Sequence, residues 1–340
     1  MTETLTVPAA TAFTPPEGLP THARAVVFEE PGRLTLRELA LAAPKAGDVV
    51  VDVEWTGIST GTERLLWTGK MPFFPGLGFP LVPGYESVGR VRWAGPESGH
   101  RVGDRVFLPG SYSFTEVRNL FGGAASTLVA PGTRAIAMGE EFGADSILLS
   151  LAATAMHAVR DSRGGYTPPL PDLIVGHGAL GRLCARLVIA LGGPPPTVWE
   201  IEPKRMGGAQ GYAVLRPEDD PKKDYRCICE VSGANGQLDA WIGRLAKGGE
   251  VVIAGFYTEP LAFQYVPAFL RGARLRVAAE WQPADLDEVR TLALTGKLSL
   301  DGLLTHRADA GDERAVADAY ATAFGDPDCI KMVLDWRNDG

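Results

Sequence analysis

The sequence predicts an α/β protein in which a doubly wound parallel sheet is inserted into a β-barrel domain. Residues 23–149 are rich in short strand patterns, residues from about 150 alternate helix and strand, and one strand–helix junction carries the spacing Gly176-x-Gly178-x-x-Gly181. We therefore expect a flexible tail at 1–22, a barrel domain at 23–149, a nucleotide-binding domain at 150–282 and a return to the barrel domain at 283–340.

The front of the chain supplies the barrel strands. Strand-like segments occur at 25–28, 48–54, 88–93 and 105–107, and turns containing Gly and Pro separate them. Many short strands with such turns are typical of a twisted barrel or sandwich rather than of a parallel sheet.

The glycine-containing turn follows the apolar run 173–175 and opens an apolar-periodic helix that ends at the Gly- and Pro-rich segment 192–196. Gly176 permits the tight turn, Gly178 lets backbone approach a pyrophosphate, and Gly181 allows the helix to pack closely on the sheet. The first helical N–H groups, at Ala179 and Leu180, are then available to phosphates. In this context the motif predicts a Rossmann dinucleotide site, although the glycines could serve packing alone.

Glu200 ends the next strand, 197–201, where a carboxylate can accept hydrogen bonds from an adenosine ribose. A carboxylate there repels a 2′-phosphate, which favours NAD over NADP. Lys204 and Arg205 follow closely and could hold that phosphate, so NADP stays open.

The rest of the α/β part follows the same alternation. We expect helices at 150–160 and 237–246, strands at 227–231, 250–256 and 274–280, an amphipathic stretch at 285–294 and a last strand at 331–335. Ligands of such sheets lie at the carboxyl ends of the strands. Ser232 and Gly233 should therefore pass over the adenosine side, and Gly255 and Phe256 should lie near the reactive end of the cofactor.

Composition restricts the class of partner. A formal net charge of -8 and a pI near 5.3 argue against nucleic acid and against a broadly basic membrane-docking face. No secretion signal or membrane-spanning apolar stretch is apparent, so we expect a cytoplasmic protein. The four cysteines form no disulfide or zinc framework and are expected to be small core residues.

The motifs at 56–63, 83–89, 103–106, 176–181, 231–233, 248–249 and 254–255, in this order, resemble those of the medium-chain dehydrogenase/reductase superfamily. The resemblance implies a GroES-like catalytic barrel with an inserted Rossmann domain, and a homodimer. It also implies that Thr154 lies near the nicotinamide and that Lys331 faces the pyrophosphate.

A narrower resemblance rests on segments 57–63, 176–183, 254–257, 278–281 and 298–303. They are similar to enzymes of bacteriochlorophyll synthesis that oxidise the 3-(1-hydroxyethyl) group of a bacteriochlorophyllide to 3-acetyl. The resemblance implies a tetrapyrrole substrate. Two alternatives stay open: an NADPH-dependent quinone or enone reductase of the same superfamily, and a nucleotide-binding carrier or sensor without turnover.

The chain departs from the zinc-dependent members, which have Cys where Ser59 stands, His where Tyr85 stands and a further Cys near Ser150. We therefore expect no metal, and protein groups must manage the proton of the alcohol. Tyr85 is the first candidate to polarise the substrate oxygen, with Glu86 as an orienting or relay group. Tyr85 could instead only wall the pocket, and Glu86 could only hold a loop.

Ser59, Thr60 and His157 are further catalytic candidates. The two hydroxyls could equally satisfy turn backbone, and His157 could be a core residue. Glu63 is expected to be a solvated charge at a helix start.

The segment 65–82 is aromatic and rich in Pro and Gly, and it could wall a large flat pocket. Lys70 or Arg64 could then meet a substrate carboxylate. The alternative is that the aromatic residues fill a domain interface. The aromatic candidates for substrate contact are Trp67, Phe73, Phe74 and Phe79.

Overall fold

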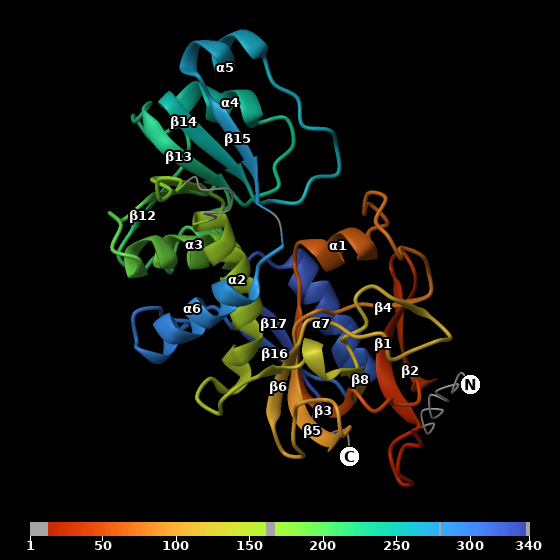
Figure 1. Ribbon diagram of the computed structural model, residues 1–340. Coiled ribbons are helices and arrows are strands. Elements are labelled where there is room, and N and C mark those ends of the chain that lie inside the picture. Colours follow the sequence, from red (N-terminus) through yellow and green to blue (C-terminus); the bar gives the residue numbers. More distant parts are fainter. Residues whose placement is uncertain (1–12, 161–166, 279, 338–340) are drawn as a thin grey trace, which may run out of the picture.

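The computed structural model describes residues 13–160, 167–278 and 280–337. Figure 1 shows two parts, one built on a six-stranded sheet and one built on the barrel strands together with the C-terminal segment. Residues 1–12 of the predicted tail lie outside the described residues, and the first strand, β1, begins at His22.

The six-stranded sheet is parallel throughout and has the order β12-β11-β10-β13-β14-β15. In chain order this is 3-2-1-4-5-6, the doubly wound arrangement that the sequence predicted. Its strands are β10 (Leu173–Val175), β11 (Thr197–Trp199), β12 (Ala213–Leu215), β13 (Tyr225–Glu230), β14 (Leu245–Ile253) and β15 (Arg274–Val277).

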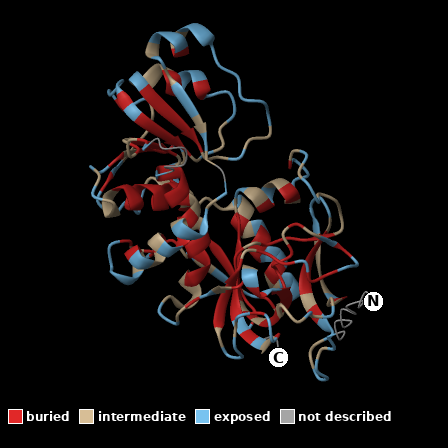
Figure 2. Cartoon of the chain, in the orientation of Figure 1, coloured by how far each residue is buried: buried red, intermediate tan, exposed pale blue. Residues whose placement is uncertain are grey.

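Successive strand residues point to opposite faces of this sheet, so both faces carry apolar side chains. Helices cover each face. Ile174 and Val252 pack with α2 (Leu148–Val159) and α3 (Ala179–Ala190), whereas Leu173 and Val251 pack with α4 (Leu238–Arg244) and α5 (Tyr265–Arg271). The four cysteines are buried free thiols, as expected. Figure 2 shows the buried interior of the sheet and the largely exposed α5.

The barrel part contains two sheets. One has the order β16-β17-β3-β5-β6-β9, with β8 also paired to β3, and the other has the order β2-β1-β4-β7. Their strands are β1 (His22–Glu30), β2 (Arg33–Ala40), β3 (Asp48–Ile58), β4 (Leu81–Val82), β5 (Ser87–Ala94), β6 (Arg105–Leu108), β7 (Arg118–Asn119), β8 (Thr127–Pro131), β9 (Ile136–Ala137), β16 (His306–Asp309) and β17 (Met332–Asp335).

The C-terminal segment completes the barrel part. Strand β17 pairs antiparallel with β3, and the buried face of α7 (Glu313–Gly325) joins the barrel core with Tyr320. Helix α6 (Pro283–Leu294) packs on α2, and α1 (Thr62–Trp67) begins directly after the loop that carries Ser59 and Thr60. The chain therefore enters the nucleotide-binding part after the barrel strands and returns to them at its end.

Candidate active site

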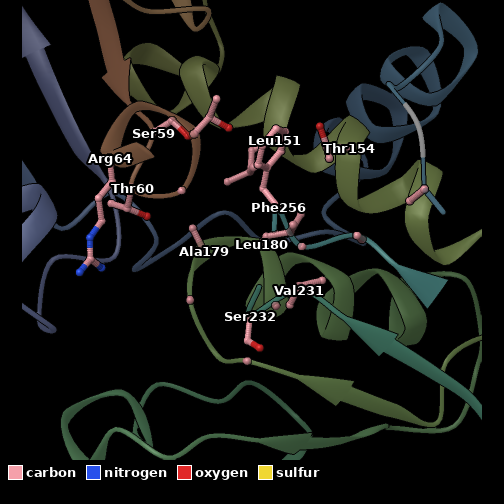
Figure 3. Close-up of a pocket in the computed structure, with 18 of the residues that line it drawn as sticks. Ser59, Thr60, Arg64, Leu151, Thr154, Ala179, Leu180, Val231, Ser232 and Phe256 are labelled. Carbon is pink, nitrogen blue, oxygen red and sulfur yellow. The ribbon is translucent and has the colours of Figure 1, made fainter. Parts of the chain in front are cut away.

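A cavity of about 1440 Å³ lies between the two parts and is lined by residues of both. Figure 3 shows Ser59, Thr60 and Arg64 of the barrel part on one side, and Ala179, Leu180, Ser232 and Phe256 of the nucleotide-binding part on the other. Such a volume is larger than that of a typical single-ligand pocket. It can hold a dinucleotide together with a second, large ligand.

The glycine turn has the geometry of a phosphate cradle. Gly176 has a φ of +106°, and a Cβ on Gly181 would lie 1.9 Å from the Gly176 carbonyl oxygen, so both positions need glycine. A Cβ on Gly178 would meet no atom within 4 Å, because Gly178 faces open cavity. Ala179 and Leu180, at the start of α3, line the same space. The turn therefore presents backbone to a ligand, and its residues fit a dinucleotide pyrophosphate.

Glu200 lies at the end of β11 and ties this turn in place. Its carboxylate accepts backbone N–H bonds from His177 at 2.9 Å, from Ile201 at 2.7 Å and from Glu202 at 2.9 Å, and it lines the cavity. The His177 ring is buried between the Arg205 carbonyl and the Tyr212 hydroxyl, and burial lowers its pKa to about 4. The His177 side chain therefore anchors the turn.

Glu230 positions two loops of the cavity, and it was not among the residues expected from the sequence. Its Oε1 accepts the backbone N–H groups of Ser232 at 2.6 Å and of Gly233 at 2.9 Å, and the Tyr257 hydroxyl donates to Oε2. Burial raises the pKa of this carboxyl. Glu230 thereby holds together the two loops that follow β13 and β14. An acid at the carboxyl end of a strand, directly before a Ser-Gly turn, was the available signal.

Most of the residues predicted to contact the cofactor line the cavity, and one of them lies behind its wall. Ser232, Gly255 and Phe256 line the cavity, as does Thr154 on α2, whose hydroxyl donates to the Ser150 carbonyl at 3.1 Å. Gly233 is not among the lining residues: it packs behind them, and a Cβ there would lie 2.7 Å from the Phe256 carbonyl oxygen.

On the barrel side, the Tyr85 hydroxyl donates to Ser59 Oγ at 2.6 Å, and both residues line the cavity with Thr60. Burial raises the pKa of Tyr85 well above its usual range, and the negative charge of Glu86 raises it further. Tyr85 is therefore protonated at neutral pH and acts as a hydrogen-bond donor.

Glu86 and Lys331 form a buried ion pair behind this surface, and each is nearly inaccessible to solvent. Glu86 lies inside the protein rather than on the cavity wall. Lys331 reaches the wall, where its ammonium group pairs with the Glu86 carboxylate; its contact with a pyrophosphate stays an expectation.

The expectation for Glu63 was wrong. Its side chain is 0 % exposed, and its carboxyl accepts the Ser59 backbone N–H at 3.2 Å and the Tyr320 hydroxyl at 3.3 Å. Burial, reinforced by the nearby Glu86 charge, raises its pKa to about 8. Tyr320 of α7 lies against the Glu63 carboxyl, which was expected to face solvent.

Several predicted site residues lie away from the cavity. His157 is buried and bonds Asp285 of α6 through Nδ1 at 2.8 Å, so it joins two helices instead of facing a substrate. Of the four aromatic candidates for substrate contact, Phe74 lines the cavity. The other expectations are corrected as follows: Trp67 and Phe79 pack against the barrel core, Phe73 is 95 % exposed, and Lys70 is exposed outside the lining.

Within the described residues, no group of three or more His, Cys, Asp and Glu side chains is placed to hold a metal ion. At the positions where zinc-dependent enzymes carry thiolate and imidazole, Ser59 and Tyr85 bond to each other. In the described part of the chain no helix has the length and apolar character needed to cross a membrane.

Comparison with known proteins defines the protein superfamily to which this fold belongs. Residues 45–140 match the family described as the alcohol dehydrogenase GroES-like domain. Solved structures share the whole fold at low identity: 2R,3R-butanediol dehydrogenase from Bacillus subtilis has a TM-score of 0.78 at 18% identity and covers 92% of this chain and 99% of its own. Acetophenone reductase from Geotrichum candidum in complex with NAD has a TM-score of 0.77 at 18% identity, covering 93% and 98%. This is the architecture of the medium-chain dehydrogenase/reductase superfamily.

Two relatives narrow the assignment. The "2-desacetyl-2-hydroxyethyl bacteriochlorophyllide A dehydrogenase" of Rhodobacter capsulatus is 54% identical over 314 residues, and that of Cereibacter sphaeroides is 53% identical over 318 residues. Each comparison covers 92% of this chain and 98% of the relative. The chain belongs to the family of these bacteriochlorophyllide dehydrogenases.

Proposed function

We propose that this protein oxidises the 3-(1-hydroxyethyl) group of a bacteriochlorophyllide to 3-acetyl, with NAD as hydride acceptor and without zinc. One observation carries the proposal: in a chain 54% identical to such dehydrogenases, a single cavity brings the Gly176 turn together with the Tyr85–Ser59 hydroxyl pair.

The cofactor preference rests on the end of β11. Glu200 places a carboxylate on the cavity wall where a 2′-phosphate would be repelled. Lys204, which could have offset that repulsion, pairs with Asp328 at 2.9 Å and Asp326 at 3.7 Å. Arg205 remains on the cavity wall, with its Nε bonded to the Pro327 carbonyl. These contacts favour NAD.

Bound NAD would take the hydride from the carbinol carbon. In the complex, the Tyr85 hydroxyl would turn from Ser59 Oγ and donate its single proton to the substrate oxygen. Ser59 Oγ, released as an acceptor, would then take the alcohol proton and give its own proton to cavity water. Glu86 acts from behind as an orienting group through its ion pair with Lys331, and its burial keeps it from exchanging protons directly with the substrate.

The test is oxidation of 3-(1-hydroxyethyl)bacteriochlorophyllide a by the purified protein with NAD, with NADH and the acetyl pigment followed together by absorbance. Both should appear in equal amounts. Tyr85→Phe should lower kcat roughly 10- to 100-fold because one hydrogen bond to a charged oxygen is lost. Val102→Ala, at an exposed position of the barrel part outside the cavity, is the control. Quinone reduction with NADPH but no alcohol oxidation would instead favour the reductase alternative, and NADH binding without turnover would favour the carrier.

We also propose a homodimer formed through β15, the end strand of the parallel sheet. Leu275 and Val277 on this strand, and Tyr265 and Phe269 on α5, are exposed apolar residues on the end strand of the sheet and the helix before it. Light scattering should give about twice the chain mass of 36.2 kDa. Val277→Lys should shift the protein to monomer, whereas Val102→Lys, equally exposed on the barrel part, should not.

A further inference from the structure

An aromatic wall, formed by Tyr85, Phe121, Phe74 and Tyr112, lines the cavity on the barrel side. The Tyr85 ring meets the Phe121 ring edge-on, with centroids 5.2 Å apart, and Phe74 meets Phe121 at 5.9 Å. The Phe121 carbonyl accepts the Ser111 backbone N–H at 2.8 Å, and Tyr112, the residue after Ser111, also lines the cavity. All of these rings line the cavity and give this side of it an aromatic, apolar surface.

Arg134 stands at the end of this wall. It is half-buried, it lines the cavity, and its guanidinium lies 5.3 Å from the centre of the Tyr112 ring. One N–H donates to the Pro109 carbonyl at 2.9 Å. That is its one hydrogen bond among the described residues, and no carboxylate there pairs with it. By contrast, Arg92 pairs with Asp52 at 2.7 Å and Arg105 with Glu54 at 3.0 Å.

The charge and the donors of Arg134 are thus left for a ligand. A guanidinium has five N–H donors in a planar fork, which matches a carboxylate in two parallel bonds. The bond to Pro109 and the stacking on Tyr112 fix its orientation before any ligand arrives, so little side-chain freedom is lost on binding.

We propose that Arg134 and Tyr112 form a subsite for a carboxylate carried by the same flat substrate whose hydroxyethyl group lies at Tyr85. The inference rests on the proposed function, because a bacteriochlorophyllide, unlike its esters, has a free propionate. Arg134 then determines specificity: it selects the acid and sets which edge of the macrocycle reaches Tyr85.

The experiment compares the free acid with its propionate methyl ester, which keeps the reacting group and loses the charge. Wild-type protein should have a kcat/KM for the acid roughly 10- to 100-fold above that for the ester, the size of a charge-assisted bond. Arg134→Gln should bring this ratio close to one, mainly through KM for the acid, and Arg134→Lys should restore part of it. Arg64→Gln removes the other cavity-lining arginine of the barrel part and should keep the wild-type ratio.

Three results would overturn the subsite: a wild-type ratio near one, an equal fall for acid and ester in Arg134→Gln, or loss of the ratio in Arg64→Gln instead. Equilibrium binding of the two pigments, followed by quenching of pigment fluorescence, separates this inference from the proposed function. Preferential binding of the acid that depends on Arg134, without any oxidation, would support the subsite while the proposed reaction fails.

Discussion

Replacing Glu63 with glutamine is expected to remove a pH dependence that this buried carboxyl imposes on stability. The pKa of Glu63 is about 8 in the folded chain, against 4.5 as an ordinary value. Between these values the unfolded chain has released the proton and the folded chain still holds it. The folded state then binds more protons, so the free energy of unfolding falls as pH rises.

The magnitude follows from the size of the shift. Each pH unit in this window costs about 1.4 kcal/mol, so the loss between pH 5 and pH 8 is on the order of 4 kcal/mol. Glutamine does not titrate, and its amide oxygen can still accept the Ser59 N–H. The difference in unfolding free energy, Glu63→Gln minus wild type, should therefore rise by about that amount over the same range.

Urea unfolding at pH 5, 6, 7 and 8, followed by tryptophan fluorescence, measures this difference directly. Glu116→Gln, which changes an exposed carboxyl on the barrel part, controls for the loss of one surface charge. A difference that stays constant with pH, or that falls as pH rises, would refute the assignment of Glu63 as a buried, protonated carboxyl.

Three further outcomes are expected. Gly181→Ala should lower the melting temperature because its Cβ meets the Gly176 carbonyl, whereas Gly178→Ala should keep the melting temperature and weaken NADH binding in a fluorescence titration; equal thermal losses would contradict this. Lys331→Met should cost about 3–5 kcal/mol in urea unfolding by leaving Glu86 unpaired, and adding Glu86→Gln should recover part of it; a single-variant loss below about 1 kcal/mol would argue against the pair. Dialysis against a chelator should leave alcohol oxidation unchanged, and a loss reversed by Zn²⁺ would refute the metal-free proposal.

The nucleotide-binding part was predictable because its signals are local. The run 173–175, the glycine turn and the helix after it are consecutive, and each reports its own conformation. Glu200 and Ser232 follow strand ends directly, so the parallel topology alone brings them to one edge of the sheet.

The barrel part was less predictable because many of its elements are short. Strands β4, β7 and β9 have two residues each, too few for any periodic pattern to emerge. Helix α7 is a different case. Its buried residues Val316, Ala319, Tyr320 and Ala323 follow the helical spacing, and Asp312 caps its first turn, so the signal was present and was overlooked.

The features of the site that the sequence did not predict share one physical cause. Glu63 at the first turn of a short helix is typical of a solvated charge, and only Tyr320, 257 residues further along the chain, makes it a buried one. Lys331 likewise meets Glu86 only because β17 pairs with β3. The reacting side of the cavity is therefore assembled from contacts between the two ends of the chain. A substitution on the inner face of α7 should consequently alter the titration of Glu63 and the position of Ser59 before it disturbs the glycine turn, whose contacts lie within the nucleotide-binding part.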